Sequence, residues 1–164
     1  GITLYAPSAN AWYRGPATAE NMRHICGIGV DPFEIVRVLH GRPPGPAPET
    51  ARIDCMQDND LYACTIESGD RIQTVWIDPI NDTVTRSRLE ENGFEEHDIL
   101  YSDFQQAGER HIPETIRVLA NRYAAGLEIR LSGSRTDPLK PEQLALKPPA
   151  GTALLPLDAL LEKR

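Results

Sequence analysis

The strongest constraint in this sequence is a series of short segments of alternating polarity between residues 50 and 132, each followed by turn residues. In the last of them Leu127, Ile129 and Leu131 alternate with Glu128 and Arg130, which indicates a strand with one buried and one solvated face. The predicted strands lie near 50–57, 60–67, 71–78, 82–90, 97–105, 112–120 and 124–132. Short strands in regular succession favour an antiparallel meander that curls into a barrel or half-barrel.

A hairpin and two short helices are predicted before this meander. Residues 2–15 read as two extended segments around a turn that contains Pro7. One helix is expected from Thr18, as its N-cap, to about residue 26. A second is expected to begin at Asp31–Pro32 and to end at Gly41. Helices this short are stable only when they pack against something larger.

The segments that flank the meander carry weaker signals. Residues 42–48 form a proline-rich stretch, which predicts a stiff extended connector. A last strand is expected at 143–146. The end of the chain, 153–161, is weakly helical in pattern, with Pro156 interrupting it.

Composition limits the classes of function. The chain has 164 residues, 40% of them hydrophobic, which is typical of one folded domain. Seventeen basic residues against twenty-four acidic ones give a net charge of −7, which argues against a protein that binds the phosphate backbone of nucleic acids. No apolar run reaches the length of a membrane-spanning helix.

Two of the three cysteines, Cys55 and Cys64, flank a probable turn at Gln57–Asp60. A four-residue turn there places Cys55 opposite Tyr62, so that a disulfide requires a register shift or a bulge. This favours buried free thiols over a bridge. If the bridge forms, it indicates a compartment outside a reducing cytosol.

Motifs for catalysis, metals and cofactors are hard to find. No phosphate-binding glycine loop, GxSxG or HExxH sequence occurs. The aspartates at 54, 58 and 60 lack the spacing of an EF-hand and favour a solvated turn. We therefore expect no catalytic residue, no metal and no cofactor. An enzyme that uses Cys26 with His24, or an acidic residue, is the weaker alternative.

Several short sequence motifs occur in an order that resembles the order found in a known protein family. They are Tyr13-Arg14-Gly15, Pro32-Phe33-Glu34-Ile35, Leu39-His40-Gly41-Arg42-Pro43-Pro44, Tyr101-Ser102-Asp103-Phe104, Ile112-Pro113-Glu114-Thr115-Ile116, and Leu144 to Gly151. Together they resemble the bacterial lipoprotein-localisation superfamily of LolA/LolB-like proteins, in particular its uncharacterised lipoprotein branch. The resemblance spans nearly all of the chain and rests on the order of the phrases.

The resemblance implies a mainly β fold of the α+β kind: a curled antiparallel sheet that forms an incomplete barrel, closed by two short plug helices. It implies one half-barrel domain over 1–164, with helices at about 18–41 and a meander at about 50–147. It also implies a cavity for an apolar ligand, such as a lipid or lipoprotein acyl chain. Strand parity and helix face give the candidate lining residues: Trp12, Met22, Ile25, Phe33, Val36, Trp76, Ile99, Tyr101, Leu127 and Ile129.

Family members carry further strands before the Tyr13-Arg14-Gly15 phrase, so we expect this chain to be the C-terminal portion of a longer protein. The resemblance implies the periplasmic side of the envelope, with the full-length lipoprotein anchored in the outer membrane through a group outside this chain. Without the earlier strands an exposed sheet edge could pair two copies into a homodimer. The main alternative function is a non-catalytic structural or protein-interaction module of the envelope.

Overall fold

The computed structural model describes residues 1–26, 31–44, 51–120, 125–133, 140 and 147–161. The chain divides into two compact units. One contains residues 1–32 and 137–164, and the other contains residues 33–136. The organisation of 1–164 as a single domain stays a prediction.

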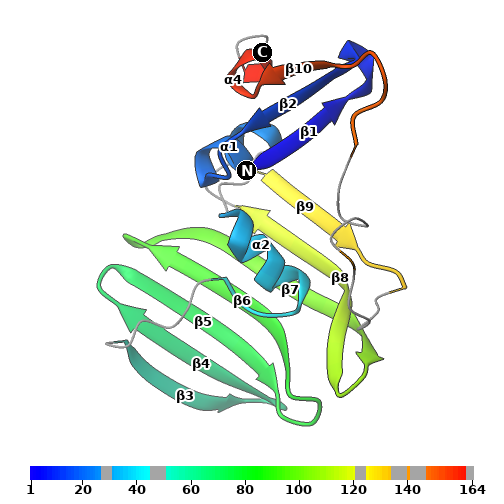
Figure 1. The fold of residues 1–164 in the computed structure, drawn as a ribbon. Coiled ribbons are helices and arrows are strands. Elements are labelled where there is room, and N and C mark those ends of the chain that lie inside the picture. Colours follow the sequence, from blue (N-terminus) through cyan, green and yellow to red (C-terminus); the bar gives the residue numbers. More distant parts are fainter. Residues whose placement is uncertain (27–30, 45–50, 121–124, 134–139, 141–146, 162–164) are drawn as a thin grey trace. The chain divides into compact units, whose positions relative to one another are not determined.

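The first unit is built on a three-stranded sheet (Figure 1). Its elements are β1 (Ile2–Ala6), the short 3-10 helix η1 (Pro7–Ala9), β2 (Ala11–Gly15), α1 (Ala19–Cys26), β10 (Ala153–Pro156) and α4 (Asp158–Leu161). Strands β1 and β2 form the predicted hairpin, with Asn10 left-handed at φ 45° after the turn. Helix α1 has the predicted cap, because the hydroxyl oxygen of Thr18 accepts a 3.2 Å hydrogen bond from the Asn21 amide.

The weakly helical prediction for 153–161 is wrong in its first half. Residues 153–156 form β10, which runs parallel to β2, and a helix begins only at Asp158. The proline at 156 fits the end of an edge strand, where a missing N–H is tolerated. The Leu157 side chain, 1% exposed, packs in a small core with Ala11 and Tyr13. This burial holds the segment against β2.

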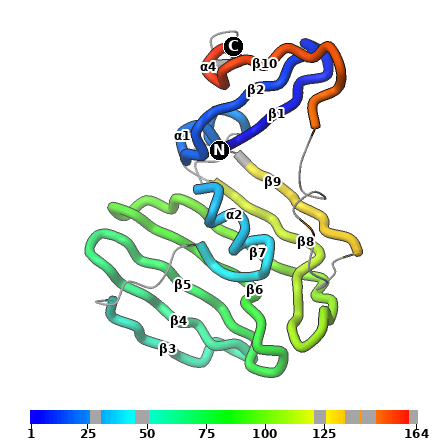
Figure 2. Tube along the Cα trace, in the orientation of Figure 1, coloured from blue at the N-terminus to red at the C-terminus, as the bar shows by residue number. Residues whose placement is uncertain are grey.

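The second unit contains the meander (Figures 1 and 2). Its elements are α2 (Pro32–Leu39), β3 (Arg52–Asp58), β4 (Leu61–Ser68), β5 (Arg71–Asp78), β6 (Thr83–Glu91), β7 (Phe94–Ala107), β8 (Arg110–Ala120) and β9 (Ala125–Arg130). Each strand is antiparallel to the next in chain order. The sheet is curled and is not closed into a barrel, as the sequence predicts. The strand expected at 143–146 lies outside the described residues.

Cross-strand register assigns every strand residue to one of two faces, because directly paired residues share a face. One continuous row runs through Cys55, Cys64, Val75, Ser87, Ile99, Val118 and Leu127. We call this side the helix face. The neighbouring row, which includes Trp76, Arg86 and Leu100, lies on the opposite side, and we call that side the outer face.

Helix α2 and the segment after it lie against the helix face. Val38 is 4% exposed. The Tyr101 hydroxyl donates a 3.1 Å hydrogen bond to the Arg42 carbonyl, and the Gln73 amide donates a 3.0 Å bond to the Pro44 carbonyl. Gly41 has a φ of 69°, and a Cβ there would lie 2.9 Å from the Pro113 ring, so the close approach to the sheet depends on glycine.

The predicted register of the two cysteines is wrong. Cys55 pairs directly with Cys64, and the two form a disulfide. The turn is centred one residue later than predicted, because Asp58 pairs with Leu61 across Asn59 and Asp60, and Asn59 adopts a left-handed conformation with φ 55°. Asparagine tolerates that conformation better than most residues, and the one-residue shift of the turn brings the cysteines opposite each other.

Candidate functional site

The helix face is covered in its middle and open toward β3. Val75 on β5 and Ile99 on β7 are 4% and 1% exposed, whereas Ile53 on β3 and Tyr62 on β4 are 55% and 46% exposed. Apolar residues of this size are normally buried when they lie on the covered face of a sheet. The β3–β4 end of the helix face therefore offers apolar surface to a ligand.

Apolar residues of this region form a continuous strip, which is exposed at Ile53 and Tyr62 and half-buried toward β6. Ile53 pairs with Ile66, and Tyr62 pairs with Ile77, which in turn pairs with Val84 on β6. The Cys55–Cys64 disulfide lies between these two rows. We call the set Ile53, Cys55, Tyr62, Cys64, Ile66, Ile77 and Val84 the open apolar strip. Neighbouring strands lie roughly 4.8 Å apart, so the row from Tyr62 to Val84 is about 10 Å long.

At Val84 the strip reaches a polar pocket of about 280 Å³. The pocket is lined by the end of the α2 segment, the β5–β6 turn and the β7–β8 turn. Its residues are His40, Gly41, Arg42, Asn81, Asp82, Thr83, Val84, Phe104, Glu109, Arg110 and His111. A second pocket, of about 270 Å³, shares His40, Arg42 and Arg110 with it and is completed by Val36 and Arg37.

Two local features shape the first pocket. Asp103 adopts a left-handed conformation with φ 54°, which interrupts the alternation of β7 between Tyr101 and Phe104. Both Tyr101, on the helix face, and Phe104, at the pocket, therefore lie on the side that carries residues 40–42. Hydrogen bonds from Thr115 and from the Ser102 hydroxyl lower the pKa of Asp103 and favour its charged form.

Tyr101 anchors the pocket wall. Its side chain is 3% exposed, and burial raises the pKa of its hydroxyl, an effect that Arg37 partly offsets. The hydroxyl therefore stays protonated and holds the Arg42 backbone against the sheet. On the helix side, His40 Nδ1 donates a 2.7 Å hydrogen bond to the Val36 carbonyl.

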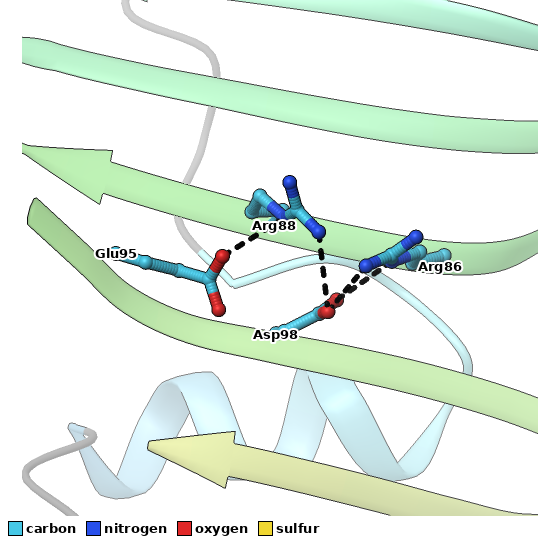
Figure 3. Close-up of polar contacts among 4 residues, drawn as sticks. All are labelled: Arg86, Arg88, Glu95 and Asp98. Atoms are coloured by element: carbon cyan, nitrogen blue, oxygen red, sulfur yellow. Dashed lines mark hydrogen bonds and ion pairs between the residues drawn. The ribbon is translucent and has the colours of Figure 1, made fainter. Parts of the chain in front are cut away.

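The outer face carries a network of charged side chains on β6 and β7, beside exposed apolar residues elsewhere on that face such as Met56 and Leu119. Asp98 accepts hydrogen bonds of 2.9 and 2.6 Å from Arg86, and Arg88 lies between Asp98 and Glu95 at 3.7 and 3.2 Å (Figure 3). Burial raises the pKa of Asp98, but the hydrogen bonds and charge of the two arginines outweigh it and hold the pKa below its usual value. This network makes the part of the outer face formed by its four residues polar and solvated.

Trp76, expected in the cavity, belongs to this outer face. It pairs with Arg86, whose guanidinium lies 4.9 Å from the ring centroid. Its indole N–H donates a 3.0 Å hydrogen bond to Asp58. The reason is strand parity, because Trp76 follows Val75, which points to the helix face.

The other predicted lining residues of the second unit do lie on the helix side, but in different surroundings. Ile99 and Tyr101 are buried core beneath the α2 segment. Leu127, 38% exposed, and Ile129, half-buried, lie on β9 at the far edge of the sheet from β3. Phe33 and Val36 are 77% and 53% exposed on α2, and Val36 lines the second pocket.

The remaining three predicted residues lie in the first unit. Trp12 is 5% exposed and stacks on Tyr5, with ring centroids 5.3 Å apart. Ile25 packs against the core around Tyr13, and Met22 is half-buried. The side chain of Cys26, named for the enzymatic alternative, is outside the described part of the chain. Within that part, no group of three or more histidine, cysteine or carboxylate residues is placed to hold a metal ion.

The predicted lining residues include none of the open apolar strip and none of the pocket arginines. Parity places Ile53, Tyr62 and Ile66 on one face in the predicted register as well as in the observed one, because Tyr62 and Cys64 lie on the same side of β4. The pocket is different, because Arg37, Arg42 and Arg110 come from segments far apart in sequence. No local pattern indicates that they meet.

Comparison with known proteins supports the fold. No protein-family model and no curated protein matches the sequence. A solved structure does match: the crystal structure of an outer membrane lipoprotein-sorting protein domain from Vibrio parahaemolyticus, with a TM-score of 0.55 and 14% sequence identity. The chain shares that domain's fold. The match covers 86% of this chain and 62% of the sorting domain, so the chain spans less than two thirds of its length.

Proposed function

We propose that this chain is a non-catalytic binding module of the bacterial envelope, which receives a lipid or lipoprotein acyl chain on the open apolar strip. The observation that carries the proposal is the exposure of Ile53 and Tyr62, 55% and 46%, on the same face as the buried core. An acyl chain that covers this strip removes apolar surface from water at roughly 0.8 kcal/mol per methylene. The length of the acyl chain would then set the affinity of the lipid for the protein.

Two further observations support the envelope as the compartment. The structural neighbour is described as an outer membrane lipoprotein-sorting domain. The Cys55–Cys64 disulfide is typical of proteins outside a reducing cytosol. In the described residues, no helix has the length and apolar character needed to cross a bilayer. We propose that attachment to the outer membrane occurs through a lipid anchor outside this chain.

Two substitutions on β3 test the strip. Ile53→Glu places a carboxylate on the helix face, and Met56→Glu places one on the outer face of the same strand, where Met56 is 68% exposed. We expect Ile53→Glu to weaken binding of 1-monolauroylglycerol about tenfold, because it removes roughly two methylene contacts. Met56→Glu should bind like the unmodified chain. Isothermal titration calorimetry below the micelle concentration measures both.

Equal affinities in the two variants would contradict the proposal, as would no binding of the neutral lipid to the unmodified chain. Both positions are exposed, so neither substitution needs the core to rearrange. Circular dichroism of each variant checks that the fold is kept.

The alternative function is an interaction module whose sheet edge pairs with a second copy. Strand β3 is an edge of its sheet, and all seven of its residues are exposed. Unpaired N–H and C=O groups on such an edge can template another strand. Sedimentation velocity tests this: a concentration-dependent dimer that Pro substitution at Asp54 abolishes would support edge pairing, and a monomer at all concentrations would contradict it.

A further inference from the structure

The arginines of the second unit divide into two groups. Six of those described form ion pairs with carboxylates: Arg52, Arg71, Arg86, Arg88, Arg117 and Arg130. The other three, Arg37, Arg42 and Arg110, form no ion pair with any described residue. All three line the same pocket of about 270 Å³, together with His40 and Val36.

This convergence is unusual in a chain with a net charge of −7. Arginine stays protonated in proteins, so three arginines that line one pocket bring positive charge to it, which a bound anion would neutralise. Arg37 is oriented by a 3.3 Å hydrogen bond from its Nε to the Pro43 carbonyl. The carboxylates of Asp82 and Glu109 line the adjoining pocket and are not among the residues that line this one.

The arginine pocket is also continuous with the open apolar strip. His40, Arg42 and Arg110 belong to both pockets, and Val84, the last residue of the strip, lines the adjoining one. An amphipathic molecule could therefore lay its chain along the strip and place a charged head at the arginines. Guanidinium groups match the oxygens of a phosphate with paired N–H donors.

We propose that the pocket formed by Arg37, Arg42 and Arg110 binds a phosphate group. Resting on the function proposed above, we infer that this phosphate is the head of the lipid whose chain covers the strip. The second unit then binds both the acyl chain and the charged head of an anionic phospholipid, which has one or more acyl chains. Apolar contacts supply the affinity for the chain, and the arginines select the head.

A matched pair of lipids tests the inference. Lauroyl lysophosphatidic acid and 1-monolauroylglycerol carry the same chain and differ by one phosphate. Calorimetry would compare both, and inorganic phosphate, on the unmodified chain and on Arg42→Gln/Arg110→Gln. The control is Arg52→Gln/Arg117→Gln, which removes the same charge from exposed positions of the outer face.

We expect the pocket variant to bind lysophosphatidic acid about tenfold more weakly for each arginine lost, with binding of monolauroylglycerol and of the control variant unchanged. Equal losses for both lipids, or no loss for the anionic one, would overturn the inference. If inorganic phosphate binds as tightly as lysophosphatidic acid and depends on the same arginines, the anion site stands, and the lipid head as its source is overturned. If monolauroylglycerol fails to bind while anion binding still requires the arginines, the proposed chain site fails and the pocket stands.

Discussion

Acidification from pH 7 to pH 4 is expected to lower the free energy of unfolding by about 3 kcal/mol through His97 alone. His97 lies on β7 and is 7% exposed. Burial first, and then the charge of Arg71, lower its pKa from 6.5 to about 4, although Glu96 and Asp98 act in the opposite direction. Its Nε2 is buried and has no hydrogen-bond partner in the described structure.

The direction follows from where the proton binds. Between pH 6.5 and about 4 the unfolded chain takes up a proton on His97 that the folded chain excludes. The contribution of His97 to the free energy of unfolding is therefore fully present above pH 6.5. It falls as the pH drops toward 4, with about 2 kcal/mol lost by pH 5. Asp98 behaves differently. Its lowered pKa means that its contribution is lost only below the ordinary carboxylate value of 3.8.

Urea unfolding at pH 7, 6 and 5 measures the effect of His97. In His97→Gln, which cannot titrate in this range, the loss between pH 7 and pH 5 should disappear. An NMR titration of the His97 ring in the folded chain should give an inflection near pH 4. A stability that is level from pH 7 to pH 5 in the unmodified chain would contradict the assignment.

The second large effect concerns the ion-pair network of the outer face. Asp98→Asn is expected to cost about 2–3 kcal/mol of stability at pH 7, because it leaves Arg86 and Arg88 side by side without their shared carboxylate. The Asp98 side chain is 8% exposed, but the Arg86 side chain is 35% exposed. Solvent around Arg86 keeps the cost below that of a fully buried pair.

Asp54→Asn is the matched control. Its partner is Arg52, at 2.7 Å, and both side chains are more than half exposed. Exposed pairs of this kind contribute little, so the control should change stability by less than roughly 0.5 kcal/mol. Equal losses in the two variants, measured by urea unfolding, would show that Asp98 does not bridge the two arginines in solution.

The sequence was sufficient to predict the meander, because turn residues and alternation are local signals. It predicted seven strands in the right order, with ends close to those of β3 to β9. It failed where a long-range contact decides the conformation. Strand β10 exists because residues 153–156 pair with β2 near the other end of the chain, and a helical pattern weakened by Pro156 does not indicate that pairing.

The candidate site was harder to predict for two physical reasons. The first is register: the left-handed Asn59 shifts the turn by one residue, so that Cys55 lies opposite Cys64 and the disulfide forms, while the same side chains stay on the helix face. Coverage of a face depends on where α2 packs. Ile99 and Tyr101, predicted to line a cavity, lie in the buried core beneath the α2 segment, while the exposed end of the helix face lies on β3 and β4.

We propose that an acyl chain binds on the open apolar strip. Photo-crosslinking tests it most directly, with a monolauroylglycerol that carries a diazirine in its chain and with peptide mapping of the adducts by mass spectrometry. We expect adducts on Ile53, Tyr62, Ile66 or Ile77, which unlabelled monolauroylglycerol suppresses. Adducts confined to outer-face residues such as Met56 or Leu100, or no adduct that the unlabelled lipid suppresses, would contradict it.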